Sequence, residues 1–380
     1  AIFSCVTMMA LSHSATACTD FRLTAQDNSV LISRTMEFAP DLKSNLRTSN
    51  RNRQFAEVAP DGKPGMTWKA KYGYVFFDGL DVDAAIDGMN EVGVSFEYLY
   101  LPGETSYPSV SGDKDTQALG YLHFGDWILS NFKTIDEIKA ALNNVVVFGQ
   151  ILPGMPNLIF PLHASIYDAS GKGIVVEFVN GRMNVFDNEV GVLTNSPTFD
   201  WQVVNLRNYV NMSPWAPNPV TVGNLVFAAT GQGSGMFGLP GDISPPSRFA
   251  KINVYKAAAY QASNMPQALN LAQHIINNVD IPLGVVRAKQ EDKTVSEFTQ
   301  WTVFKDLTNK MFYYRTYADT SLRVVSLGSI DFSEAAPRLK MPIVSNQFIT
   351  DVTKQLTGSR AASAATVTAA LPALPGKIPA

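Results

Sequence analysis

The stretch that decides the fold is Ala15-Thr16-Ala17-Cys18-Thr19-Asp20-Phe21, where an uncharged start joins the body of the chain. Residues 1–17 contain no Lys, Arg, Asp or Glu and end in the small-x-small pattern that signal peptidases cleave. A cut after Ala17 makes Cys18 the first residue, so one residue carries both a nucleophilic thiol and a free α-amine that can act as base. The junction therefore predicts an N-terminal-nucleophile hydrolase that becomes active when a signal peptide remnant, residues 1–17, is removed.

Composition and the number of cysteines limit which partners, membrane contacts and disulfides can be expected. The 30 basic and 33 acidic residues give a net charge of -3, so no nucleic-acid partner is predicted. No apolar run reaches the ~18 residues needed to cross a bilayer, so we expect no stable membrane insertion and a periplasmic or secreted protein. Cys5 leaves with the signal, which leaves Cys18 without a disulfide partner. Spacing alone fits a reactive thiol and a buried small hydrophobe equally well.

The body of the chain, residues 18–357, reads as one domain of mixed α and β structure. Two apolar segments joined by a turn at residues 26–28 predict a hairpin over 18–38 that starts at Cys18. Further strands are expected at 72–77, 93–100, 164–167, 173–178, 190–194, 298–304, 311–317 and 322–326. Helices are indicated by a capping box at 134–137, by Pro266 in a first turn, and by the segment from Pro246 to Tyr260. This pattern predicts a layered α+β sandwich followed by a low-complexity tail, 358–380.

Two motifs are set aside. The glycine-rich segment 231–238 lacks the Lys-Ser/Thr ending of a phosphate loop, so no nucleotide is expected there. His123, His163 and His274 are far apart in sequence and read as core or surface histidines. We therefore predict no metal and no cofactor.

Several segments nevertheless resemble a known family in order and spacing. They are Cys18-Thr19, Ser33-Arg34-Thr35-Met36-Glu37, Asp87-Gly88-Met89-Asn90-Glu91, Gly191-Val192-Leu193-Thr194-Asn195-Ser196-Pro197-Thr198-Phe199-Asp200-Trp201, Leu239-Pro240-Gly241-Asp242 and Ser247-Arg248-Phe249. The chain resembles the choloylglycine hydrolases, the family of bile salt hydrolases and penicillin V acylases. The resemblance implies a four-layer αββα sandwich, a small-molecule amide substrate and a homotetramer.

The resemblance also implies roles for individual residues. Cys18 would attack the amide carbonyl, and Asn195 would hold the oxyanion together with the backbone N–H of Tyr100. Arg34 and Arg248 would lie near the thiol and favour the thiolate. Without the resemblance, Asn195 reads as a turn residue, Tyr100 as a packing aromatic, and each arginine as a surface or ion-pair residue.

Glu37 departs from the family pattern. The family usually has Asp at this position, where the carboxylate binds the freed α-amine. Glu keeps the charge but is one methylene longer, so the amine must be met at another distance or angle. The alternative is a Glu that faces solvent at a strand end.

Substrate choice depends on Tyr100. Bile salt hydrolases commonly have Asn there, whereas penicillin V acylases have an aromatic residue. We therefore predict a relative of the Gram-negative penicillin V acylases that cleaves penicillin V and N-acyl homoserine lactones, with a conjugated bile salt hydrolase as the alternative. An alternative of another class is a periplasmic binding protein anchored through a lipid on Cys18, because Ala15-Thr16-Ala17-Cys18 weakly resembles a lipoprotein acylation site.

Overall fold

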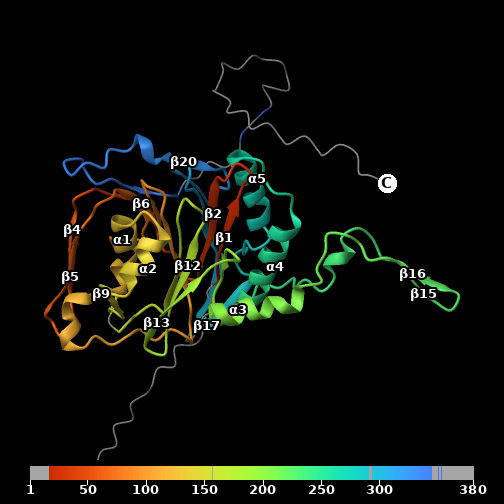
Figure 1. The fold of residues 1–380 in the computed structure, drawn as a ribbon, viewed down its shortest axis with the longest axis horizontal. Coiled ribbons are helices and arrows are strands. Elements are labelled where there is room, and N and C mark those ends of the chain that lie inside the picture. Colours follow the sequence, from red (N-terminus) through yellow and green to blue (C-terminus); the bar gives the residue numbers. More distant parts are fainter. Residues whose placement is uncertain (1–16, 156, 291–292, 345–349, 351, 353–380) are drawn as a thin grey trace, which may run out of the picture.

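Two large antiparallel sheets lie face to face at the centre of the molecule, with helices on both outer sides (Figure 1). The computed structural model describes residues 17–155, 157–290, 293–344, 350 and 352. The segment 1–16 and the tail 358–380 lie outside the described residues, so the predictions for both stay predictions. The four layers confirm the predicted αββα sandwich.

The first sheet carries Cys18. Its strands, in spatial order, are β14 (Val192–Leu193), β1 (Cys18–Thr24), β2 (Val30–Phe38), β18 (Lys293–Asp306), β19 (Met311–Thr316) and β20 (Arg323–Ser326), with β17 (Val286–Gln290) paired to β18. The predicted hairpin is confirmed, with Cys18 opposite Met36 as the first pair of β1 and β2. Its turn places Asn28 at φ 64°, a left-handed conformation that Asn tolerates. The nucleophile candidate thus stands at the start of a central strand.

The second sheet forms the opposite wall. Its order is β13 (Arg182–Asp187), β12 (Gly173–Val179), β11 (Leu162–Tyr167), β8 (Ser95–Tyr100), β7 (Asp87–Asn90), β6 (Tyr74–Phe77), β3 (Asn45–Ser49) and β21 (Lys340–Pro342). Strands β6 and β7 are buried along their whole length, since one face meets the first sheet and the other meets helices. The side chains between the sheets therefore have no route to water except at the sheet edges.

The helices form the outer layers. On the second sheet lie α1 (Tyr121–Asn131) and α2 (Ile135–Leu142); on the first lie α4 (Pro245–Ala258) and α5 (Met265–Ile276), with α3 (Phe199–Asn205) beside α4. Thr134 and Glu137 form the predicted capping box of α2. The sequence patterns missed α1, because all but two of its eleven residues are buried and no polar face marks its period. No helix in the described part of the chain is long and apolar enough to cross a bilayer.

Short elements complete the fold. They are the pair β4 (Gln54–Val58) and β5 (Pro64–Lys69), the parallel pair β9 (Ala118–Gly120) and β10 (Val146–Phe148), the hairpin β15 (Val220–Val222) and β16 (Leu225–Phe227), and the 3-10 turns Gly112–Gln117, Leu206–Tyr209, Ser234–Met236 and Leu327–Ser329. Residues 210–243, which we call the arm, extend away from the sandwich with β15 and β16 at the outer end (Figure 1). The strand predicted at 190–194 is only Val192–Leu193, because the Gly191 amide folds back onto the Asn188 side chain.

Candidate active site

Cys18 lies buried at the end of β1, with 2% of its surface exposed. Its Sγ is 3.7 Å from the Arg34 Nη2, 3.9 Å from the Met36 Sδ and 3.8 Å from the Glu37 backbone oxygen. Burial raises the pKa of the Cys18 thiol, whereas the positive charge of Arg34 opposes this rise. The described chain has Ala17 joined to Cys18, so the nitrogen here is a peptide amide.

On the sulfur side of Cys18, buried cations contact buried carboxylates directly. Arg34 donates to the Tyr98 carbonyl at 2.7 Å, and its Nη1 lies 3.7 Å from the Asp87 carboxylate. Lys305 binds Asp87 at 2.8 Å and also contacts Glu97. The guanidinium also stacks over the Trp301 ring at 4.6 Å. Arg34 is therefore fixed in place beside the sulfur by groups from three strands, β7, β8 and β18.

On the nitrogen side, Asn195 and Arg248 surround the Cys18 backbone. The Asn195 Oδ1 accepts from the Cys18 N–H at 2.8 Å and from the Arg248 Nη2 at 2.7 Å. The Asn195 Nδ2 donates to the Tyr100 carbonyl at 2.7 Å. Arg248, at the start of α4, also donates to the Thr19 hydroxyl at 2.6 Å and to the Cys18 carbonyl. Asn195 thus bridges the nucleophile strand and the strand that ends at Tyr100.

Glu37 and Glu297 are buried acids on the same side. The Glu37 carboxyl accepts from the hydroxyls of Thr35 at 3.0 Å and Thr299 at 2.5 Å, and burial raises its pKa to about 8. Glu297, two residues before Thr299 on β18, has both oxygens buried without a hydrogen-bond partner, and burial raises its pKa to about 8 as well. No ion pair joins either acid to Arg248 within the described residues. The alternative of a solvent-facing Glu37 is wrong, since 1% of its surface is exposed.

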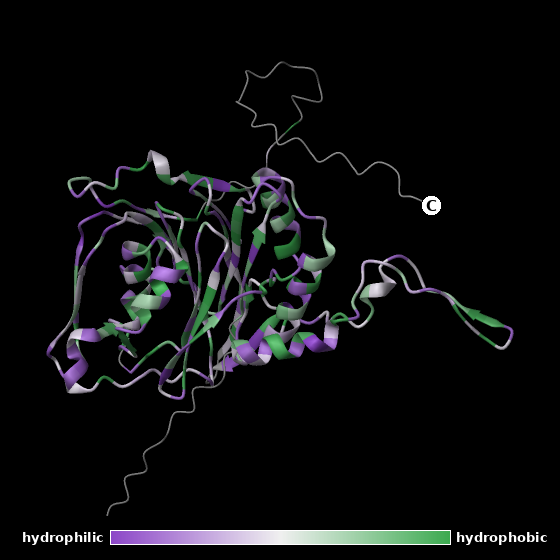
Figure 2. Ribbon diagram, in the orientation of Figure 1, coloured by the Kyte–Doolittle hydropathy of each residue, from purple (hydrophilic) through white to green (hydrophobic). Residues whose placement is uncertain are grey.

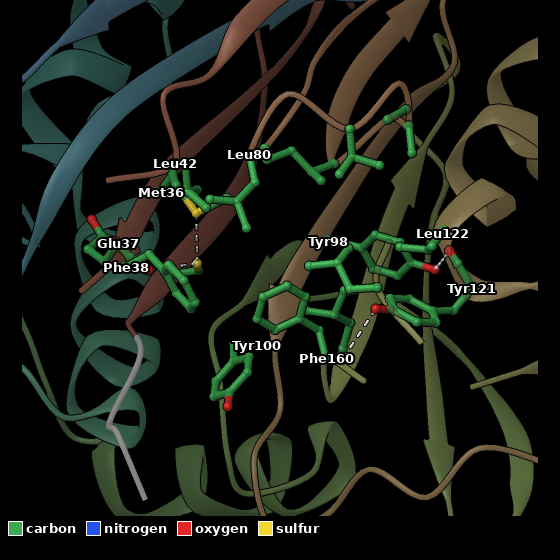
Figure 3. A pocket seen from close by; sticks show the side chains of 18 residues that line it. Met36, Glu37, Phe38, Leu42, Leu80, Tyr98, Tyr100, Tyr121, Leu122 and Phe160 are labelled. Atoms are coloured by element: carbon green, nitrogen blue, oxygen red, sulfur yellow. Dashed lines mark hydrogen bonds between the residues drawn. The ribbon is translucent and has the colours of Figure 1, made fainter. Parts of the chain in front are cut away.

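An apolar pocket opens beside the Cys18 sulfur and holds about 740 Å³ including its mouth (Figure 3). Its walls include Met36, Phe38, Leu42, Leu80, Tyr98, Tyr100, Tyr121, Leu122, Leu152 and Phe160. The Tyr98 hydroxyl donates to the Tyr121 carbonyl at 2.9 Å, and the Tyr121 hydroxyl accepts from the Phe160 amide at 3.2 Å. The Tyr100 ring stands at the edge of the pocket with its hydroxyl turned away from the other labelled side chains (Figure 3). The pocket therefore presents mainly carbon surface to a bound group.

The structure brings all six residues proposed from the sequence to one place, either around the Cys18 backbone or at the pocket beside its sulfur. Both arginines are fully buried, so the alternative of a surface residue is wrong, whereas the alternative of an ion-pair residue fits Arg34, which lies 3.7 Å from Asp87. The sequence reasoning missed Asp87 as a site residue, along with Glu97, Glu297 and Lys305. Charged residues inside otherwise apolar strands were the available signal, because an ionised side chain is buried only where it finds partners or changes protonation.

The four layers, with a buried cysteine at the start of a central strand, define the fold of the N-terminal-nucleophile hydrolases. Residues 18–339 match the family described as linear amide C–N hydrolases, choloylglycine hydrolase family. The chain belongs to this family and is a linear amide C–N hydrolase. The alternative of an anchored binding protein is therefore wrong about the class of protein.

Three relatives show where the chain lies within the family. A bile salt hydrolase/transferase from Clostridium perfringens is 35% identical over 315 residues, 82% of this chain and 92% of the relative. The crystal structure of a mutant conjugated bile acid hydrolase from Clostridium perfringens has a TM-score of 0.76 at 29% identity, covering 88% of this chain and 99% of that chain. Penicillin V acylase from Agrobacterium tumefaciens has a TM-score of 0.70 at 26% identity, covering 87% and 93%.

These similarities change one expectation. The predicted kinship with penicillin V acylases holds at the level of the family. Within it, the bile acid hydrolase structure is more similar than the penicillin V acylase structure, with TM-scores of 0.76 and 0.70. The comparisons thus favour the alternative, a conjugated bile salt hydrolase, over the main prediction.

Proposed function

We propose that the chain cut before Cys18 hydrolyses amides through a Cys18 thioester. The thiol gives its proton to the α-amine while the sulfur bonds to the amide carbonyl carbon. The amine then protonates the leaving nitrogen, the C–N bond breaks, and water attacks the thioester with the amine as base. The observation that carries this proposal is the Cys18 sulfur at the mouth of an apolar pocket, 3.7 Å from the Arg34 guanidinium.

Asn195 is the proposed side-chain donor to the oxyanion. Its Nδ2 has two N–H groups, and one is engaged with the Tyr100 carbonyl at 2.7 Å. The second is available to a substrate oxygen, with the Tyr100 backbone N–H as the other proposed donor. A donor of this kind supplies about 3 kcal/mol of transition-state stabilisation.

The remaining roles follow from charge. Arg34 favours the thiolate because its cation lies beside the sulfur. Arg248 orients Asn195 and the Cys18 carbonyl. The α-ammonium exposed by the cut is a cation close to Glu37, so in the cut protein the Glu37 carboxyl ionises more readily than its pKa of about 8 allows here.

Conjugated bile salts are the first proposed substrates, because relatives with that printed activity are more similar than penicillin V acylases. The pocket supports an apolar acyl group of this kind, since its walls are mostly carbon.

Penicillin V is the second candidate, together with N-acyl homoserine lactones. A specific observation favours it: Tyr100, Phe38 and Phe160 form an aromatic group, with Phe38 in edge-to-face contact with the other two rings. A flat phenoxyacetyl group or an acyl chain packs well against such rings.

The test combines mass and activity. The exported protein is weighed intact and assayed against a glycine-conjugated bile salt, penicillin V and an acyl homoserine lactone. We expect a mass beginning at Cys18, and a loss of activity of about 10⁴-fold or more in Cys18→Ala. A diacylglyceryl mass, turnover by the uncut chain, or full activity of Cys18→Ala contradicts the proposal.

Export to the periplasm or outside the cell is part of the same proposal.

Assembly into a homo-oligomer through the arm is also proposed. The arm exposes large apolar residues that a monomer rarely leaves in water, including Trp215 at 71% and Phe237 at 92% exposure. Figure 2 shows hydrophobic residues in its outer hairpin. Sedimentation of the wild type and of the double variant Trp215→Glu, Phe237→Glu checks this proposal. We expect the wild type to be a tetramer and the double variant to be a smaller species. A monomeric wild type contradicts the proposal.

A further inference from the structure

A buried histidine–glutamate pair lies beneath the loop that carries Asn195. His163 on β11 and Glu177 on β12 are 0% and 1% exposed, and the His163 Nδ1 is 3.0 Å from the Glu177 Oε1. The mechanism proposed above does not use either residue. Their burial between the layers means that each polar contact they make is costly to lose.

The pair holds both ends of the loop 194–199. The His163 Nε2 is 3.0 Å from the Thr194 carbonyl, directly before Asn195. The Glu177 Oε1 accepts from the Phe199 N–H at 3.0 Å, where α3 begins. The strand β14 stops at Leu193, so no ladder bond continues past that residue to fix the loop.

The hydrogen-bond roles follow from the partners. A carbonyl oxygen only accepts, so the His163 Nε2 carries a hydrogen and donates to Thr194. The contact between the His163 Nδ1 and the Glu177 Oε1 is a hydrogen bond with a proton on one of the two atoms, and the same Oε1 accepts from the Phe199 N–H. An apolar ring at 163 removes both contacts made by His163. Both contacts of Glu177 are made by the same oxygen, Oε1, so an apolar methionine at 177 removes both.

We propose that His163 and Glu177 are positioning residues that set the place of the Asn195 side chain by holding the loop 194–199 at both ends. This inference rests on the proposed role of Asn195 as oxyanion donor. Displacing a catalytic group by about 1 Å can cost ~10²-fold in rate. The loss falls on kcat, because the oxyanion exists only in the transition state.

The test is a double-mutant cycle in the cut enzyme with its best substrate. We expect His163→Phe to lower kcat about 10²-fold with KM changed less than about 3-fold. In the Asn195→Ala background, the same change at 163 should cost less than about 3-fold, because the positioned group is gone. Equal losses in both backgrounds, or a loss confined to KM, overturn the inference.

Two further variants keep the test decisive. Glu177→Met replaces His163→Phe if the latter does not fold, as judged by thermal unfolding, and the same coupling is expected. His123→Phe is the matched control, since His123 pairs with Glu57 at 2.6 Å but contacts no residue of the loop. It should leave kcat within about 3-fold of wild type. If Asn195→Ala alone has no effect while Cys18→Ala is inactive, the proposed oxyanion role of Asn195 is wrong. If Asn195→Ala is impaired and the cycle shows no coupling, only the positioning role of His163 and Glu177 is wrong.

Discussion

The two sides of Cys18 handle buried charge in opposite ways. On the sulfur side, Arg34 and Lys305 contact Asp87 and Glu97, so cations and carboxylates neutralise one another directly. On the nitrogen side, Arg248 donates to neutral oxygens, Glu37 accepts from two hydroxyls, and Glu297 has no hydrogen-bond partner. On the sulfur side the cations contact carboxylates directly, whereas on the nitrogen side no ion pair joins Arg248 to Glu37 or Glu297 in the described part of the chain.

The difference indicates which side would respond to the proposed cut before Cys18. A new α-ammonium adds a positive charge next to Glu37 and changes little around Asp87, whose cations are already in place. We therefore expect the sulfur side to behave alike before and after cleavage, and the nitrogen side to differ.

Breaking the sulfur side should have the largest effect on stability. Lys305→Met leaves Asp87 and Glu97 buried without their shared cation, which costs about 3–5 kcal/mol of unfolding free energy. Urea denaturation measures it. Lys139→Met is the control, because Lys139 pairs with Asp187 at the surface and should lose less than about 1 kcal/mol. Similar losses in the two variants would contradict the proposed importance of the buried cluster.

The nitrogen side should give the stability of the uncut chain a pH dependence. The folded-state pKa of Glu37, about 8, lies above the unfolded value of 4.5. Between these two pH values Glu37 is protonated in the folded state and ionised in the unfolded state. Stability then falls as pH rises from 4.5 to about 8. Glu37 contributes about 1.4 kcal/mol per pH unit to this slope and Glu297, with the same shift, contributes as well, so Glu37→Gln should remove only the Glu37 share. Urea denaturation across this range checks it. An equally steep slope in the variant, or a steeper slope after cleavage, would be against it.

The reactivity of the Cys18 thiol should depend on the charge of Arg34 on the sulfur side. Arg34→Gln removes the cation nearest the sulfur, so the pKa of the Cys18 thiol rises further and alkylation by iodoacetamide at pH 7 slows about 10-fold. The pH profile of alkylation measures the shift. Arg47→Gln, in an ion-pair group with Asp78 and Asp81, serves as control and should leave the profile unchanged. An unshifted profile in Arg34→Gln would remove the assigned role of this arginine.

The smallest expected effect concerns one hydroxyl. Thr299→Val removes a donor to Glu37 and an acceptor for the Ile281 N–H, which costs about 1–2 kcal/mol and raises the pKa of Glu37 further. Denaturation and the same pH series measure both changes. A variant as stable as wild type with an unaltered slope would show that Glu37 does not depend on this contact.

The sequence predicted the site better than it predicted the groups that support it. The hairpin from Cys18 was readable because its apolar segments and turn are local, and the roles of Arg34, Asn195 and Arg248 came from a family resemblance. The partners of Glu37 were not readable, since Thr299 lies 262 residues away and meets it only through strand pairing. Lys305 and Asp87 likewise come from different sheets. Long-range pairing decides such contacts, and no local pattern encodes it.

The first pair of the β1 and β2 ladder, Cys18 opposite Met36, has a consequence for how the protein can be switched on. Every pair of that ladder begins at or after Cys18, so a cut before this residue removes none of them. The hydrogen bond from the Cys18 nitrogen to Asn195 also lies beyond the cut. If the cut before Cys18 activates the protein as proposed, activation is a one-way chemical event in a finished scaffold, which needs neither a hinge nor a rearranged sheet.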